Sequence, residues 1–90
     1  MKKAIITVVG KDTVGIIAAI CTYLSEQSIN ILDISQTIVD GYFNMMMVAD
    51  VTDCGKGFAA LADELRAVGE QKGVIVHCQS DEIFQQMHRI

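Results

Sequence analysis

The spacing of apolar residues divides the chain into six segments of regular structure. An apolar run over residues 4–9 is typical of a buried strand. Apolar side chains recur three and four positions apart over residues 15–27 and 58–70, which predicts two amphipathic helices. Segments with strand spacing predict three more strands, over residues 30–39, 42–52 and 74–79. The predicted order is strand, helix, strand, strand, helix, strand.

The second and third predicted strands form a hairpin around Asp40-Gly41, a dipeptide typical of a type I′ turn. Counting back from this turn pairs Val39 with Tyr42 and predicts the register of the whole hairpin, because a slip of one residue would exchange the two faces. At its far end the register predicts three further pairs, Leu32 with Ala49, Asn30 with Val51 and Ile31 with Asp50.

This register gives the hairpin two unlike faces. One face is nearly all apolar, from Ile38 and Phe43 beside the turn to Leu32 and Ala49, and we expect both of its strands to meet the helices. The opposite face is half apolar and carries Ile31, Val39, Tyr42, Met46 and Val48. An antiparallel sheet can leave one face to solvent, but this face is unusually apolar for that role. We therefore expect this face, or the strand edges around it, to contact another copy of the chain.

Together the elements predict an α+β fold, a ferredoxin-like βαββαβ sandwich with two helices on one face of a four-stranded antiparallel sheet. Ninety residues make a single domain, residues 1–90. A short C-terminal helix is predicted over residues 81–88, where Ile83, Phe84 and Met87 would dock it.

Charge and cysteine content narrow the classes of partner. The net charge is −4, and no basic cluster exists beyond Lys2-Lys3, which argues against nucleic acid and against a membrane surface. No apolar run approaches the roughly 20 residues that span a bilayer. The apolar stretch near the N-terminus is interrupted and no small-residue cleavage site follows it, so we expect a cytoplasmic location. The cysteines are odd in number and far apart, which predicts reduced thiols. Neither they nor the two histidines have the spacing of a metal site.

The joint between the first strand and the first helix is the candidate binding site. Two glycines allow the backbone to turn sharply there, and the first N–H groups of a helix have no partner within it. Asn30, at the start of the next strand, adds an amide that can both donate and accept. These groups suit a zwitterion, with N–H donors for its carboxylate and Asp12 for its ammonium group. The loop residues assigned to this site are Gly10, Lys11, Asp12, Thr13, Val14 and Gly15.

A purely structural interpretation of the same residues stays open. Asp12 would then cap the helix or a turn, and Asn30 would anchor a tight connection. The chain has no serine or cysteine in a catalytic pattern with histidine and no evident pair of cooperating acids, so we expect neither an enzyme nor a bound cofactor. The sequence Met45-Met46-Met47 alternates between two faces, which favours packing over a metal site.

Other uses of this fold require residues that the loop lacks. A P-loop needs Lys and Ser or Thr directly after its second glycine, where this chain has Ile16-Ile17. A dinucleotide-binding loop needs a third glycine, a carrier of soft metals needs paired cysteines, and an acylphosphatase-like enzyme needs an arginine. An RNA-recognition domain needs aromatic residues on the open face of its central strands.

Two segments resemble a known family. The sequences G-K-D-T-V-G-I-I-A-A-I and S-I-N-I-L-D-I-S-Q are similar to those of ACT domains, above all in small bacterial proteins made of one ACT domain and, more distantly, in the glycine cleavage system transcriptional repressor. The resemblance implies a ligand bound between the first loop and the second strand of a neighbouring subunit. It implies polar ligand contacts at Asp12 and Asn30 and close packing of the helix start at Gly15. Val14 stands where the family often has proline.

The expected function is therefore regulatory. The resemblance implies a module that binds an amino acid or a similar small metabolite, acts as a homodimer or higher oligomer, and has no catalytic activity. Because the chain has no attached effector domain, a signal would pass to a separate effector protein. The alternative is a module for protein–protein interaction or oligomerisation whose ligand pocket is vestigial.

Overall fold

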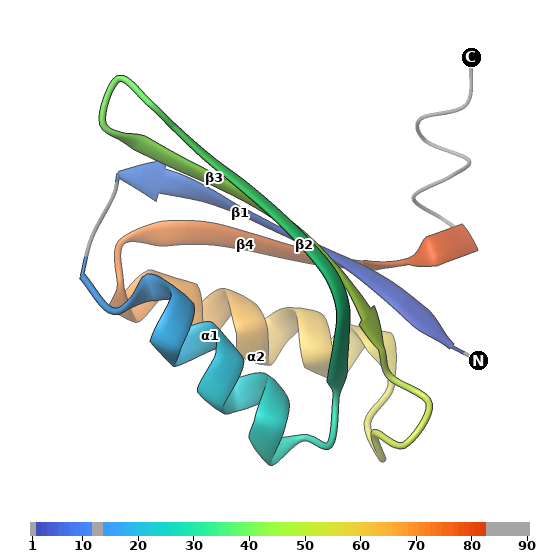
Figure 1. The fold of residues 1–90 in the computed structure, drawn as a ribbon. Coiled ribbons are helices and arrows are strands. Elements are labelled where there is room, and N and C mark those ends of the chain that lie inside the picture. Colours follow the sequence, from blue (N-terminus) through green and yellow to red (C-terminus); the bar gives the residue numbers. More distant parts are fainter. Residues whose placement is uncertain (1, 12–13, 83–90) are drawn as a thin grey trace.

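A computed structural model describes residues 2–11 and 14–82. Figure 1 shows two layers, a four-stranded sheet above two helices. The elements follow the predicted order, with β1 (Lys3–Lys11), α1 (Ile16–Glu26), β2 (Asn30–Val39), β3 (Tyr42–Asp50), α2 (Phe58–Gln71) and β4 (Val74–Ser80). The predicted ferredoxin-like architecture is thus confirmed. The predicted C-terminal helix over residues 81–88 lies almost wholly outside the described residues.

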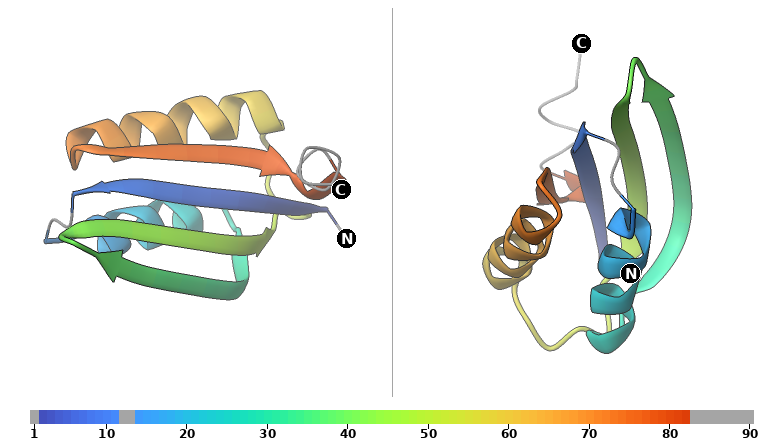
Figure 2. Two further views of the ribbon diagram at one scale, coloured as in Figure 1. Left: turned by 90° about the horizontal axis from the view of Figure 1, so that it is seen from above. Right: turned by 90° about the vertical axis from the view of Figure 1, so that its left-hand side faces the viewer.

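The sheet has the strand order β2-β3-β1-β4, and all neighbouring strands are antiparallel. Both helices lie on the same face, as the two views of Figure 2 show. Among the residues that the structure describes, neither α1 nor α2 lies on the opposite face, which is called the helix-free face below. Within the described residues, neither helix is long and apolar enough to cross a membrane.

The core lies between the sheet and the helices, where burial of apolar surface stabilises the fold. On β3, every second residue from Phe43 to Ala49 is buried, and on β4 the buried positions are Val74, Val76 and Cys78. The helices contribute the stripes predicted from their spacing, including Ile16, Ile20, Leu24, Leu61 and Leu65.

Helix α2 approaches β4 closely. A Cβ atom at Gly69 would lie 2.5 Å from Cγ2 of Val76 and 2.9 Å from the carbonyl oxygen of Val74. Both separations are shorter than packed atoms allow, so only glycine permits this approach. On its exposed side, α2 has an ion pair between Arg66 and Asp63, with 3.1 Å between Nη1 and Oδ1.

The hairpin turn is the one predicted. Asp40 and Gly41 have φ angles of 52° and 80°, and a type I′ turn requires positive values at both. The predicted register holds from Val39–Tyr42 to Asp33–Val48. Beyond Asp33 the register prediction is wrong.

A β-bulge between Ile31 and Asp33 causes this difference. One extra residue in β2 shifts the pairing, so that Ile31 lies opposite Ala49 and Asn30 lies opposite Asp50. Ile31 therefore packs against the core, and Asn30 moves to the helix-free side. The bulge partly buries an apolar side chain that a regular register would leave on the open face.

Strand β2 also departs from the prediction that both hairpin strands meet the helices. None of its residues is fully buried. Leu32, Ile34 and Ile38 are 42%, 43% and 60% exposed, although β3 beside them is buried at every second residue. The reason is position, since β2 is the edge strand farthest from β4 and α2.

Candidate functional site

The joint between β1 and α1 depends on Gly15. Its φ angle is +89°, in the left-handed region that L side chains rarely adopt, and its carbonyl oxygen accepts the first helical hydrogen bond, 2.9 Å from the nitrogen of Ala19. Glycine has no side chain to accept hydrogen bonds from the N–H groups of the first turn. The turning role predicted for Gly15 is therefore confirmed.

Gly10 has a different role from the one predicted. It remains within β1, between Phe43 on β3 and Val74 on β4, and its φ angle is not positive. A Cβ atom there would lie 2.7 Å from Cγ1 and 2.9 Å from Cα of Val74. The prediction that Gly10 turns the chain is wrong, because this glycine instead allows β4 to pack closely.

The remaining loop residues are placed only in part. Lys11 ends β1 opposite Tyr42, and Val14 is 95% exposed. Asp12 and Thr13 lie outside the described residues, so their assignment to the site stays a prediction.

Asn30 lies at the other end of the sheet from this loop. It is exposed and opposite Asp50, which in turn is opposite Lys3 at the start of β1. From Lys3 to Lys11 the strand rises about 26 Å at about 3.3 Å per residue. Within one subunit, the two predicted parts of the site are therefore too far apart to hold one small ligand.

The structure adds a basic residue that sequence reasoning missed. Lys72 follows the last turn of α2, and its Nζ atom is 3.4 Å from the position that a Cβ at Gly15 would occupy. An ammonium group thus lies beside the start of α1. No local pattern indicates this contact, because it depends on how α1 and α2 pack.

An open groove of about 390 Å³ runs between the helices from this point. Small residues of α1, among them Ala18, Ala19 and Thr22, form one side, and Val68, Gln71 and Lys72 of α2 form the other. The groove begins at Gly15 and therefore continues the predicted site along the helix layer.

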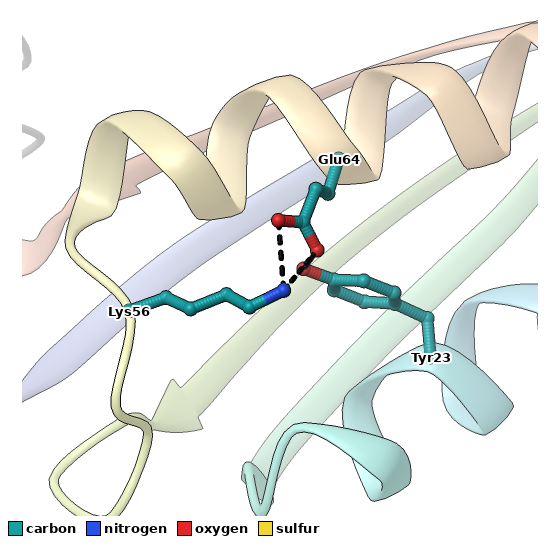
Figure 3. Close-up of polar contacts among 3 residues, drawn as sticks. All are labelled: Tyr23, Lys56 and Glu64. Atoms are coloured by element: carbon teal, nitrogen blue, oxygen red, sulfur yellow. Dashed lines mark hydrogen bonds and ion pairs between the residues drawn. The ribbon is translucent and has the colours of Figure 1, made fainter.

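Farther along the helices, Tyr23, Lys56 and Glu64 form a polar cluster (Figure 3). The Tyr23 hydroxyl donates to Oε1 of Glu64 at 2.8 Å, and Nζ of Lys56 lies 2.6 Å from Oε1 and 2.8 Å from Oε2. Burial and the Glu64 carboxylate raise the pKa of Tyr23 above its usual range, and hydrogen bonds from Lys56 and Tyr23 lower the pKa of Glu64. These contacts join α1 to α2.

The thiol of Cys78 is poorly suited to nucleophilic chemistry. Burial, with a smaller contribution from nearby Cys54, raises its pKa to about 11, so the thiol is protonated at neutral pH. Among the residues that the structure describes, no three His, Cys, Asp or Glu side chains gather where they could hold a metal ion.

Comparison with known proteins places the chain in a family. The ACT domain model matches residues 2–79. A UPF0237 protein of Bifidobacterium longum is 60% identical over 90 residues, which is 100% of both chains. The solved structure of an ACT domain protein from Streptococcus pneumoniae is 45% identical, with a TM-score of 0.82 over 93% of this chain and 94% of that chain.

A more distant neighbour shares the fold alone. The structure of a proposed glycine cleavage system transcriptional repressor is 20% identical, with a TM-score of 0.73 over 88% of this chain and 45% of that one. The family match therefore rests on the domain model and the close relatives. On that basis, the chain belongs to the ACT domain family.

Proposed function

We propose that this chain is a regulatory module that binds a small zwitterionic metabolite, an amino acid, between two copies of itself and catalyses no reaction. ACT domains are regulatory ligand-binding modules, which supports the general role. One observation carries the specific proposal. The loop at Gly15 and the amide of Asn30 lie at opposite ends of one subunit, while β2 has a free edge.

Pairing of two β2 strands would bring these parts together. An antiparallel pair about a twofold axis near Ile34 and Ser35 places Asn30 of one copy beside Val39 of the other. Val39 is opposite Tyr42, which is opposite Lys11. The Asn30 end of each copy thus lies at the loop end of its neighbour, three strand spacings or about 14 Å from Lys11, and the dimer has two equivalent sites.

The surface of β2 fits this arrangement. An open strand edge has unpaired N–H and C=O groups that another strand can satisfy. Its helix-facing side carries Ile34 and Ile38, which the described part of one copy leaves 43% and 60% exposed. A second copy would shield this apolar surface as well as the edge, and both effects favour the dimer.

The groups at each site match the two charges of an amino acid. The first N–H groups of α1 and the ammonium of Lys72 would hold the carboxylate, and Asp12 would hold the ammonium group. Asn30 of the neighbouring copy, on the helix-free side, would border the site. A ligand with about ten heavy atoms reaches affinities in the micromolar to millimolar range. Such affinities suit a sensor of metabolite concentration, whose signal passes to an effector protein in the cytoplasm.

The test is a thermal-shift and calorimetric screen of the common amino acids against the purified protein. At least one should raise the melting temperature, Asp12→Ala should remove the response, and Asn30→Ala should weaken it. Asn44→Ala is the matched control, because Asn44 is an exposed amide on the helix-free face. Failure of every amino acid to bind, in a protein that forms dimers, would reject the ligand and keep the dimer.

A module for protein–protein interaction with a vestigial pocket is the second candidate. The 95% exposure of Val14 at the loop favours it, because an apolar side chain facing solvent suits a protein partner better than a charged ligand. This candidate predicts a partner whose binding is unchanged by any amino acid and is weakened by Val14→Asp.

A further inference from the structure

The groove between α1 and α2 is open at its start because of Gly15. A Cβ atom at this position would lie 3.4 Å from Nζ and 3.9 Å from Cε of Lys72, so a side chain there would fill the entrance. Glycine leaves the entrance free, and a ligand whose carboxylate lies at the start of α1 can extend into the groove. The groove volume of about 390 Å³ is within the range of roughly 300–1,000 Å³ that small-molecule sites have.

Among the described residues, charged side chains line this groove only at its two ends. Lys72 lies beside Gly15, and Glu26 lies about 16 Å farther along α1 at 1.5 Å per residue. Neither side chain has a hydrogen bond or an ion pair with another residue that the structure describes. The lining between these ends is uncharged and consists of Ala18, Ala19, Thr22, Tyr23, Val68 and Gln71. No described residue therefore competes with a ligand for the ammonium group of Lys72, and the adjoining wall suits an uncharged group.

The part of the groove nearest Lys72 is apolar. Ala18 and Ala19 are within about 6 Å of Gly15 along the helix axis, and Val68 lines the other side on α2. Thr22, which carries a hydroxyl group, is about 10 Å from Gly15 along the same axis. A ligand with its carboxylate at Lys72 therefore places a side chain of moderate length against methyl groups. Burial of apolar carbons there is favourable, whereas a charged side chain would lose hydration without an oppositely charged partner.

We propose that this groove determines which amino acid the module binds, by taking the side chain of a medium-sized aliphatic amino acid such as leucine. The inference rests on the proposed function and adds the specificity of the same site. Lys72 pairs with the carboxylate that all amino acids share, while Ala18, Ala19 and Val68 contact the part that differs between them. One end of the ligand is thus held by charge, and the other end is selected by apolar contact.

Ala18 is the residue through which this selectivity can be changed. Side chains on a helix lean toward its N-terminus, so a longer side chain at position 18 would cover the groove beside Gly15. Ala18 is exposed, and alanine, leucine and methionine all favour helices. Ala18→Leu and Ala18→Met should therefore fill the groove with little cost to folding.

Isothermal titration calorimetry of the purified protein with leucine, alanine, glutamate and lysine tests the proposal. Each carbon that becomes half-buried raises the affinity about twofold, so the wild type should bind leucine about tenfold more tightly than alanine. Glutamate and lysine should bind more weakly than leucine. Ala18→Leu and Ala18→Met should each weaken leucine binding about tenfold and leave alanine binding unchanged. Lys72→Gln should weaken the binding of leucine and alanine by the same factor, because both have the same carboxylate.

Ala60→Leu is the matched control, because it makes the same change on the exposed surface of α2 outside the groove. It should keep the preference for leucine, and circular dichroism of each variant establishes that it is folded. A wild type that prefers a charged, aromatic or smaller amino acid to leucine would overturn the role of the groove and leave the proposed function intact. A folded variant at position 18 that keeps the preference for leucine would do the same. Failure of every common amino acid to bind would overturn both.

Discussion

The two edge strands of the sheet both carry apolar residues at positions facing the helices, but their surroundings are very different. On β4, three residues facing the helices are buried, whereas none on β2 is fully buried, although β2 carries Leu32, Ile34 and Ile38. The difference shows that an apolar pattern indicates which side chains share a face. Burial also requires an element to cover that face.

For β4 the covering element is α2, which lies against the strand at Gly69. Helix α1 is joined to α2 through Tyr23 and Glu64, so the helix layer is anchored toward the β4 side of the sheet. The uncovered surface of β2 is then available for another copy of the chain, which is the basis of the proposed dimer.

The largest effect is expected from shortening a valine on each edge strand. Val76 on β4 is 1% exposed, and Val76→Ala should lower the free energy of unfolding by about 2 kcal/mol through lost burial and a residual cavity. Val39→Ala on β2 should cost less than about 0.5 kcal/mol in a single copy. Urea denaturation measures both, and equal costs would show that the helix-free side of β2, on which Val39 lies, is covered in solution.

The close approach of α2 to β4 is tested by adding one methyl group. Gly69→Ala should destabilise the fold by about 1–2 kcal/mol, because the overlap with Val76 and Val74 exceeds the gain of about 1 kcal/mol in helix propensity. Gly55→Ala is the matched control, since its Cβ would meet no atom within 4 Å. It should be neutral or slightly stabilising. A stabilised Gly69→Ala variant would contradict the packing described for α2.

The link between α1 and α2 predicts a dependence on alkaline pH. The pKa of Tyr23 is higher in the folded state than in the unfolded state. The contribution of Tyr23 to the free energy of unfolding is therefore fully present below the unfolded pKa of about 10 and is lost as the pH rises above that value. Tyr23→Phe should lower the free energy of unfolding by about 1 kcal/mol at neutral pH. The stability of this variant should then fall less steeply than that of the wild type at alkaline pH. Cys78, whose pKa is raised to about 11, leaves a smaller loss in the same direction.

Tyr42→Phe is the control for this measurement, because Tyr42 is exposed on the helix-free face. Thermal unfolding between neutral pH and pH values above 10 should give this variant the wild-type profile. Tyr23→Phe with an unchanged alkaline profile would show that the phenol does not report on the contact between the helices.

Much of the fold could be predicted because its signals are local. The Asp40-Gly41 turn determines the register of the hairpin near the turn, and helical spacing identifies the stripes that enter the core. The bulge at the far end of β2 could not be predicted in this way. It depends on the gain from burying Ile31 against residues distant in sequence.

The candidate site, too, could be predicted only where its features depend on residues close together in the sequence. The need for glycine at position 15 follows from the junction between strand and helix, and its φ angle agrees with that prediction. The close contact that requires Gly10, the ammonium of Lys72 beside α1, and the distance from Asn30 to the loop all come from packing between separate elements. Asp12 stays a prediction.

The sequence by itself determined the order of the elements, the turn, the helical stripes and the family, because each depends on residues close together in the chain or on a recognisable motif. Only the tertiary structure decided that β2 remains uncovered and that the two parts of the site lie at opposite ends of the sheet. Both follow from where the helix layer lies on the sheet, and that position depends on packing between elements far apart in sequence.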